Sequence, residues 1–162
     1  TLWKRLKDGT IDCIVTDHAP HTLEAKSAGF PRAPAGMPGV ETSLPVMLTH
    51  AVGGKCSVTD VVNWMCEGPA KVYGVEKKGS IIEGYDADLT LVDLETHRII
   101  SDEDTWTKVG WTPYAGRELT GWPIYTIVDG EIVHRREVGG SLKGISVAEP
   151  GSTGRVLKFN RF

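Results

Sequence analysis

The sequence lacks the features that mark a membrane span, a nucleic-acid binder or a disulfide scaffold. It has no apolar run near the ~18 residues that a spanning helix needs. Its net charge of −3 gives no broad positive surface for an anionic partner. The three cysteines form no Cys-x-x-Cys pair, which argues against a disulfide framework or a structural zinc site. We therefore expect a cytoplasmic protein whose partners include no membrane and no nucleic acid.

The first forty residues contain one short helix, one apolar strand and a long loop. Residues 2–7 have the pattern of a helix that ends at Asp8 and Gly9. Residues 11–16 are apolar on both faces, which is typical of a buried parallel strand. Residues 19–40 contain four prolines and three glycines, which exclude a long helix or strand. A loop of this length usually forms part of a binding site or a lid.

Helical patterns follow the loop and then give way to short strands. Residues 41–52 have helical spacing, and Ser57 with Asp60 predicts a capped helix start. The apolar pattern that continues from there is interrupted at Gly68 and Pro69. Asp129 and Gly130 form a type I′ hairpin signal. The predicted strands are at residues 81–82, 88–92, 97–100, 125–128 and 131–134.

The end of the apolar strand is the most informative place in the chain. Asp17 and His18 follow it directly, and in (β/α)₈ enzymes catalytic groups converge where strands end. Together with later segments in the same order and spacing, this motif resembles class I dihydroorotase of the amidohydrolase superfamily, from about residue 2 to residue 134. The segments are Asp17-His18-Ala19-Pro20-His21, Arg32-Ala33-Pro34-Ala35-Gly36, Gly39-Val40-Glu41-Thr42-Ser43-Leu44-Pro45, Lys78-Gly79-Ser80-Ile81, Gly84-Tyr85-Asp86-Ala87-Asp88-Leu89, Thr112-Pro113-Tyr114-Ala115-Gly116 and Gly121-Trp122-Pro123.

The resemblance implies an α/β fold, namely the C-terminal fragment of a metal-dependent (β/α)₈ TIM barrel plus part of a small β-sandwich domain. Residues 1–78 would hold the last barrel strand, the substrate loop and the C-terminal helices. Residues 79–138 would belong to the β-domain, and residues 139–162 would form a peripheral tail. Because one strand cannot close a barrel, we expect the missing N-terminal half of the same protein to be a partner. We rate a free-standing module as the weaker alternative, because a lone strand would expose its edges.

The resemblance also assigns site residues. Asp17 would ligate one of two zinc ions and act as general acid and base. The other zinc ligands would lie mostly outside this chain, which we therefore expect to be inactive alone. His21, Ala35 and Gly36 would bind the substrate, and His18 would orient a neighbouring group. From the residues alone, Asp17 also suits a cap or turn, Gly36 suits a tight turn, and the spacing of His18 and His21 gives weak support for a metal pair.

The function that this resemblance implies is the zinc-dependent, reversible cyclisation of N-carbamoyl-L-aspartate to L-dihydroorotate in de novo pyrimidine biosynthesis. A second hypothesis is another cyclic amidohydrolase, such as a hydantoinase, a dihydropyrimidinase or an allantoinase. A third is a non-catalytic dihydroorotase-like scaffold for aspartate transcarbamoylase. His21 and the loop around Ala35 favour dihydroorotase, because its small-molecule substrate carries a carboxylate. A homodimer and a complex with aspartate transcarbamoylase are the assemblies to consider.

Overall fold

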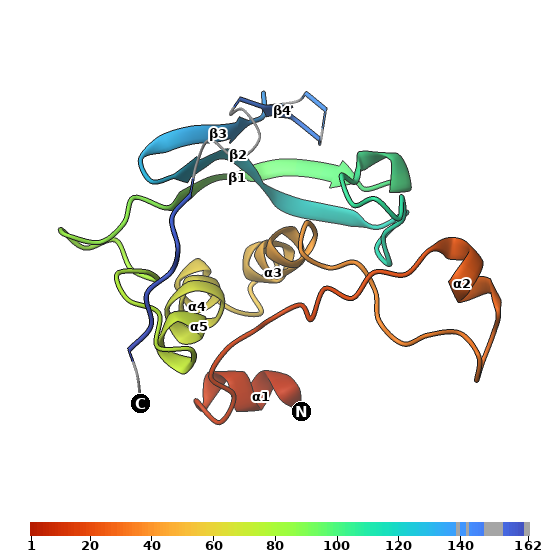
Figure 1. Cartoon of the computed structure of the whole chain (residues 1–162), viewed down its shortest axis with the longest axis horizontal. Helices are drawn as coiled ribbons and strands as arrows, with labels where there is room; N and C mark the ends of the chain where they lie inside the picture. The colour runs from red at the N-terminus through yellow and green to blue at the C-terminus, as the bar shows by residue number, and fades with distance from the viewer. Residues whose placement is uncertain (139, 142, 148–153, 161–162) are drawn as a thin grey trace.

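Helices occupy the first half of the chain and an antiparallel sheet the second half. The computed structural model describes residues 1–138, 140–141, 143–147 and 154–160. Figure 1 shows the sheet as one layer with α3 packed beneath it and the other helices further below, while α2 projects to one side. In chain order the elements are α1 (Leu2–Lys7), α2 (Leu23–Ser27), α3 (Ser43–Val52), α4 (Val58–Val62), the π-helical turn η1 (Asn63–Glu67), α5 (Gly68–Val72), β1 (Leu89–Ile99), the 3₁₀ turn η2 (Asp102–Asp104), β2 (Glu118–Val128), β3 (Glu131–Arg135) and β4 (Ile145–Ser146).

The helix signals are largely confirmed. The predicted helix start is a capping box, in which the Asp60 amide donates to Ser57 Oγ at 3.0 Å and the Ser57 amide donates to Asp60 Oδ2 at 2.8 Å. The interruption predicted at Gly68 and Pro69 is wrong, because helical structure runs on through η1 into α5. A wide π turn leaves room for Pro69, whose backbone has no N–H to donate.

The strand predicted at residues 11–16 is not formed. No strand of the described residues pairs with this segment, and a strand exists only through such pairing. The Ile14 amide instead donates to the Trp64 carbonyl at 2.8 Å. A Cβ added at Gly68 would lie 2.4 Å from the Asp12 carbonyl oxygen, so the segment packs directly on the helix end. Ile14 packs against the helical core cluster, whereas Val15 is 59% exposed.

The sheet has the order β1-β2-β3-β4, with every pair antiparallel. The type I′ turn is confirmed, since Asp129 and Gly130 have φ of 53° and 84°. The strands predicted at residues 88–92 and 97–100 merge into β1, with irregular pairing between Asp93 and His97, and residues 81–82 form no strand. Strand β2 begins seven residues earlier than predicted, at Glu118 rather than at residue 125.

Helix α3 packs on the helices on one side and on the sheet on the other. One buried cluster joins Met47 and Leu48 to Cys56, Val61 and Trp64. The second consists of Ile100, Leu119 and Trp122, with Val46 packed against it. Met47 and Leu48 of α3 are buried, whereas Val52, at the end of the helix, is half exposed. This arrangement fixes the start of α3, and therefore the end of the 19–40 loop, against the sheet.

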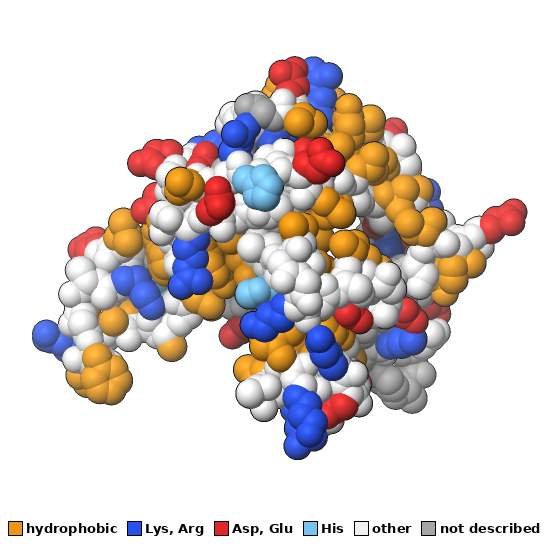
Figure 2. Space-filling view, turned by 180° about the vertical axis from the view of Figure 1, so that it is seen from behind, with side chains coloured by type: hydrophobic (Ala, Val, Ile, Leu, Met, Phe, Trp, Pro, Cys, Tyr) orange, Lys and Arg blue, Asp and Glu red, His pale blue; other side chains and the backbone are white. Residues whose placement is uncertain are grey.

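The C-terminal residues return to the helices. Among the described residues, Val75 pairs with Phe159, and the Glu76 amide donates to the Lys158 carbonyl at 2.9 Å. Figure 2 shows the molecule from behind. Hydrophobic side chains lie at the tip of the projecting segment that contains α2, and others are scattered over the rest of the surface. Phe30, in the 19–40 loop, is fully exposed. No helix in the described part of the chain is long and apolar enough to cross a membrane.

Candidate functional site

Asp17 stands at the point where the extended segment enters the 19–40 loop. Its backbone has φ of 45°, a left-handed conformation that aspartate tolerates better than most residues. The residue is exposed, and within the described residues no hydrogen bond or ion pair engages its carboxylate. Asp17 therefore has a carboxylate free to bind a cation or move a proton, rather than one used up as a helix cap.

His18 joins the two ends of the 19–40 loop. Its Nδ1 accepts hydrogen bonds from the Gly39 amide at 3.1 Å and the Val40 amide at 3.3 Å. Because Nδ1 accepts, the proton of the neutral ring sits on Nε2. A Cβ added at Gly39 would lie 3.3 Å from the Thr16 Cβ, so the backbone at the end of the loop lies in contact with the residue before Asp17. This geometry suits a residue that orients the loop beside Asp17.

The middle of the loop folds back onto the same segment. A Cβ added at Gly36 would lie 2.5 Å from the Ala19 carbonyl oxygen and 2.9 Å from its Cβ. Lys26 holds this arrangement, because its Nζ donates to the carbonyls of Pro34 at 2.9 Å and Gly36 at 3.0 Å. Ala35 lies exposed between those two anchored residues. The structure therefore brings Gly36 against Ala19, two residues from both Asp17 and His21.

His21 is half buried and is held through its backbone. The Trp111 indole Nε1 donates to the His21 carbonyl at 2.7 Å, from a residue ninety positions later in the chain. This contact ties the start of the loop to residues 101–117 while leaving the imidazole unengaged within the described residues. Trp111 and Lys26 are site residues that the sequence alone did not reveal. Trp111 directly precedes one of the resembling segments, which is the signal that could have found it.

Glu41 fastens residues 101–117 at the other end of the loop. Its carboxylate accepts from the Trp106 amide at 2.7 Å and from the Thr107 amide at 2.8 Å. The Thr107 hydroxyl donates to the same carboxylate. Three donors leave this carboxylate little capacity for a ligand. We conclude that Glu41 is a structural anchor that positions the end of the 19–40 loop.

The described residues contain no group of three His, Cys, Asp or Glu side chains placed to hold a metal. Asp17 is the one free carboxylate at the site, and the Nδ1 atom of His18 is already engaged. The described residues of this site can therefore supply one carboxylate ligand to a metal centre, but they do not form a complete metal centre by themselves. The arrangement combines an exposed carboxylate, a half-buried imidazole and a loop fixed close to both.

Comparison with known proteins gives consistent matches across most of the chain. A sequence model of the Amidohydrolase family matches residues 1–133. A protein from Pyrococcus furiosus named dihydroorotase is 40% identical over 157 residues, which are 96% of this chain and 36% of that protein. A dihydroorotase from Bacillus thuringiensis is 43% identical over 133 residues, which are 82% of this chain and 31% of that protein.

Solved structures match at the level of the fold as well. The L-hydantoinase (dihydropyrimidinase) from Arthrobacter aurescens aligns with a TM-score of 0.81 at 36% identity, covering 91% of this chain and 32% of that one. The chain thus spans about a third of the length of the curated relatives that it matches, at 36% and 31%.

Proposed function

Because the chain belongs to the amidohydrolase family, as its match over residues 1–133 establishes, we propose that it supplies one part of a dihydroorotase active site. The reaction is the reversible cyclisation of N-carbamoyl-L-aspartate to L-dihydroorotate. The observation that carries this proposal is the free Asp17 carboxylate beside a loop that His18 and Lys26 fold back onto it. The identity of 40% and 43% to proteins named dihydroorotase supports the choice of substrate.

Each site residue has a task in this proposal. Asp17 accepts a proton from the attacking water and returns it to the ring nitrogen that leaves when dihydroorotate opens. The same carboxylate would be one ligand of a zinc centre, since the family is in general metal-dependent. When bound, zinc would polarise the amide carbonyl and acidify the water.

Substrate binding falls to the loop. The His21 ring donates a hydrogen bond to the substrate carboxylate, which hydantoin and dihydrouracil lack. The backbone of Ala35 and Gly36 holds the ring of the substrate, and the absence of a Cβ at Gly36 lets this part of the loop pack against Ala19. His18 acts as a positioning residue through its hydrogen bonds to Gly39 and Val40.

The architecture in this proposal is the end of a (β/α)₈ barrel at residues 1–78, followed by part of a β-sandwich at residues 79–138. The change from helices to an antiparallel sheet after residue 78 supports this division. Lys78 stands at the boundary, where its Nζ pairs with Asp86 at 3.1 Å and also with Asp88. Residues 11–16 would gain the strand partners that they lack here from the remaining part of the barrel.

A cyclic amidohydrolase without a substrate carboxylate is the second candidate. The similarity to the L-hydantoinase structure, at a TM-score of 0.81 and 36% identity, favours it. The two candidates share the task of Asp17 and differ in that of His21. A non-catalytic scaffold would need neither residue.

The test is to express the complete gene product and to assay ring opening of dihydroorotate, hydantoin and dihydrouracil in parallel. We expect activity on dihydroorotate that a chelator removes and added zinc restores. D17N should abolish turnover and lower the bound metal, whereas H21A should raise KM for dihydroorotate and leave the metal content unchanged. Activity confined to hydantoin or dihydrouracil would replace dihydroorotase with the second candidate. A metal-bound gene product that turns over none of the three would favour the scaffold.

Two variants serve as controls. D12N removes a neighbouring exposed carboxylate of the same segment, and H97A removes a histidine whose Nδ1 contacts the Thr120 hydroxyl at 2.8 Å in the sheet. Both should retain the parent activity. The 162-residue chain assayed alone should not open the ring, and turnover by it would contradict the expectation that other metal ligands are needed.

A further inference from the structure

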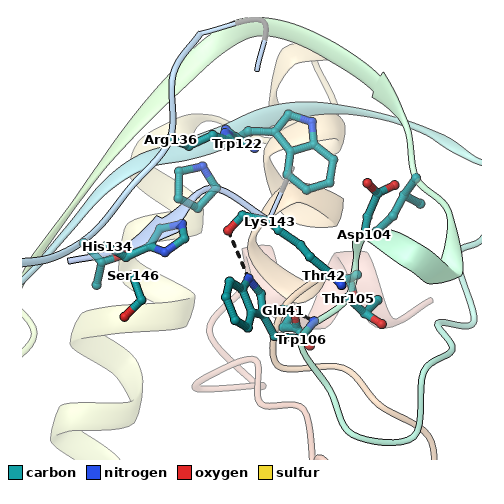
Figure 3. A pocket seen from close by; sticks show the side chains of 13 residues that line it. Glu41, Thr42, Asp104, Thr105, Trp106, Trp122, His134, Arg136, Lys143 and Ser146 are labelled. Carbon is teal, nitrogen blue, oxygen red and sulfur yellow. Dashed lines mark hydrogen bonds between the residues drawn. The ribbon is translucent and has the colours of Figure 1, made fainter. Parts of the chain in front are cut away.

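A cavity lies on the sheet side of α3. Of the residues described at the candidate site, Glu41 and Trp106 line it, whereas Asp17 and His21 do not. Its volume is about 370 Å³, within the range of pockets that hold small molecules. Figure 3 shows Trp122 and Arg136 on the sheet side, Trp106 on the opposite side and His134 on a third. The start of α3, the η2 turn, β2, β3 and the residues around β4 all contribute to its wall.

The cavity wall carries two cations, Arg136 and Lys143, and two carboxylates, Glu41 and Asp104, but no ion pair within the described residues joins them. Arg136 is only 7% exposed, yet within the described residues no hydrogen bond or ion pair reaches its guanidinium. Lys143 also lines the cavity and lies 6.0 Å from the centre of the Trp106 ring. Buried guanidinium groups are normally paired, because removing a charge from water is costly. No fully buried side-chain nitrogen of the described residues lacks a hydrogen-bond partner, so the unpaired nitrogens of the Arg136 guanidinium still reach the open cavity, where they are accessible to an anion.

The carboxylates at the wall keep their negative charge, but their hydrogen bonds go to groups other than Arg136 and Lys143. Glu41 accepts from two backbone amides and a hydroxyl. Asp104 accepts from the Ser101 amide at 2.8 Å and from its hydroxyl at 2.9 Å. Burial lowers the pKa of Arg136, a shift that Asp93 opposes from beyond ion-pair distance and Arg98 reinforces. Burial also lowers the pKa of His134, with Arg136 adding to the effect.

Flat aromatic and apolar groups form the rest of the wall. The Arg136 guanidinium lies 5.3 Å from the centre of the Trp122 ring, and Trp106 faces the cavity from the other side. Ile100 and Pro123 add apolar surface, while Thr126 and Ser146 add hydroxyls. A ligand that suits this wall has a planar apolar part for the indole rings and an anionic group for the guanidinium.

We propose that this cavity is a binding site for a small planar organic anion, either an aromatic carboxylate or an aromatic phosphate monoester. Arg136 is the anchor that donates to the anionic group, and Lys143 adds a second positive charge. The rings of Trp106 and Trp122 enclose the planar part. The site is distinct from the proposed ring-opening site, because Asp17, His21, Ala35 and Gly36 do not line it. Glu41 and Trp106, which fasten the end of the 19–40 loop, belong to its wall.

The test is a titration of the complete gene product, followed through the indole N–H signals of its tryptophans in NMR spectra. The probes are phenyl phosphate and benzoate, with inorganic phosphate and phenol as the separate halves of the ligand. We expect phenyl phosphate or benzoate to shift the signals of Trp106 and Trp122 saturably, and phenyl phosphate to bind at least about tenfold more tightly than inorganic phosphate or phenol. Trp3 and Trp64, which lie in the other core cluster, should not shift.

Variants distinguish a specific contact between Arg136 and the anion from a general effect of positive charge on binding. R136Q should weaken binding about tenfold or more, and R136K should recover part of it, because lysine keeps the charge but loses the planar fork. R135Q removes the exposed neighbouring arginine and should leave binding unchanged. K143Q, at a half-buried position, gives a smaller loss and tests the site even if R136Q fails to fold. The proposal is overturned if no probe shifts Trp106 and Trp122 saturably up to about 10 mM, or if R135Q weakens binding as much as R136Q.

Discussion

Replacing Gly121 with alanine should destabilise the contact between the sheet and α3. Gly121 lies in β2 with φ of 87°, and a Cβ there would stand 2.6 Å from the Leu48 Cβ and 3.1 Å from its Cδ1. Leu48 is only 2% exposed and belongs to a rigid helix, so it cannot move away without cost. The contact is reinforced beside Gly121, where the Thr120 amide donates to Thr49 Oγ1 at 2.8 Å.

The magnitude follows from two separate costs. A left-handed φ costs alanine about 1–2 kcal/mol, and the lower entropy of the unfolded chain offsets about 0.4–1 kcal/mol of this. Overpacking against Leu48 adds about 1–3 kcal/mol. G121A should therefore lower the free energy of unfolding by about 2–4 kcal/mol, measured by urea denaturation followed by circular dichroism and tryptophan fluorescence.

Gly54 provides the matched control. It also has a left-handed φ, of 74°, but nothing lies within 4 Å of a Cβ added there. G54A should carry only the backbone cost, about 1 kcal/mol or less after the entropy offset. If G121A and G54A destabilise equally, the tight approach of β2 to α3 is not real, and the placement of the loop by α3 loses its basis.

Three further predictions concern the loop and the helix cap. W111F removes the indole donor to the His21 carbonyl, a part-buried hydrogen bond that contributes about 0.5–1.5 kcal/mol. In the complete gene product, KM for dihydroorotate should therefore rise about 2–13-fold with kcat little changed. An unchanged KM would show that Trp111 does not position His21. K26M should raise KM in the same assay through release of the Pro34 and Gly36 carbonyls, whereas K55M, at an exposed lysine outside the loop, should not. Hydrogen bonds from the Ser57 backbone and side chain lower the pKa of Asp60 below its ordinary 3.8, so the capping box stabilises the fold above that pH and loses its contribution as the pH falls through the lowered pKa. A carbon-13 NMR titration should show this lowered pKa, and S57A should move it back toward 3.8; an equal pKa in both proteins would exclude the hydroxyl as a cause.

Local signals in the sequence predicted local structure well. The capping pair Ser57 and Asp60 and the turn at Asp129 and Gly130 each depend on a few adjacent residues, and both are present as predicted. Signals that depend on distant partners were less informative. Residues 11–16 have the composition of a buried strand, but pairing is a property of two segments, and this segment packs on the helices instead.

Strand β2 shows a second limit. Gly121 and Pro123 look like strand breakers in the sequence, yet both lie within β2. Gly121 is there because α3 approaches too closely for a side chain, which only the tertiary structure reveals. Pro123 lies opposite Val92 next to an irregularity in the pairing, where prolines are tolerated.

The candidate site was predictable where its residues are adjacent and unpredictable where they are not. Asp17, His18 and His21 stand together in one motif, and their roles stay predictions until the assays above are done. Lys26 and Trp111 hold the loop through hydrogen bonds to backbone carbonyl groups. Every residue has such a group, so these contacts leave no mark on the residue type of the partner. Their partners, Gly36 and His21, are 10 and 90 positions away, so no short sequence pattern predicts these two contacts.

The two-point attachment of residues 101–117, through Glu41 and Trp111, has a consequence for how such enzymes can be re-engineered or can diverge. A loop grafted from a relative with another specificity would arrive without the indole that holds residue 21 and the amides that hold residue 41. Exchange of the loop alone should therefore yield chimeras in which the loop is poorly positioned and the selectivity for substrate is low. The transferable unit would be both segments together, residues 19–41 and 101–117, although about a third of the chain separates them.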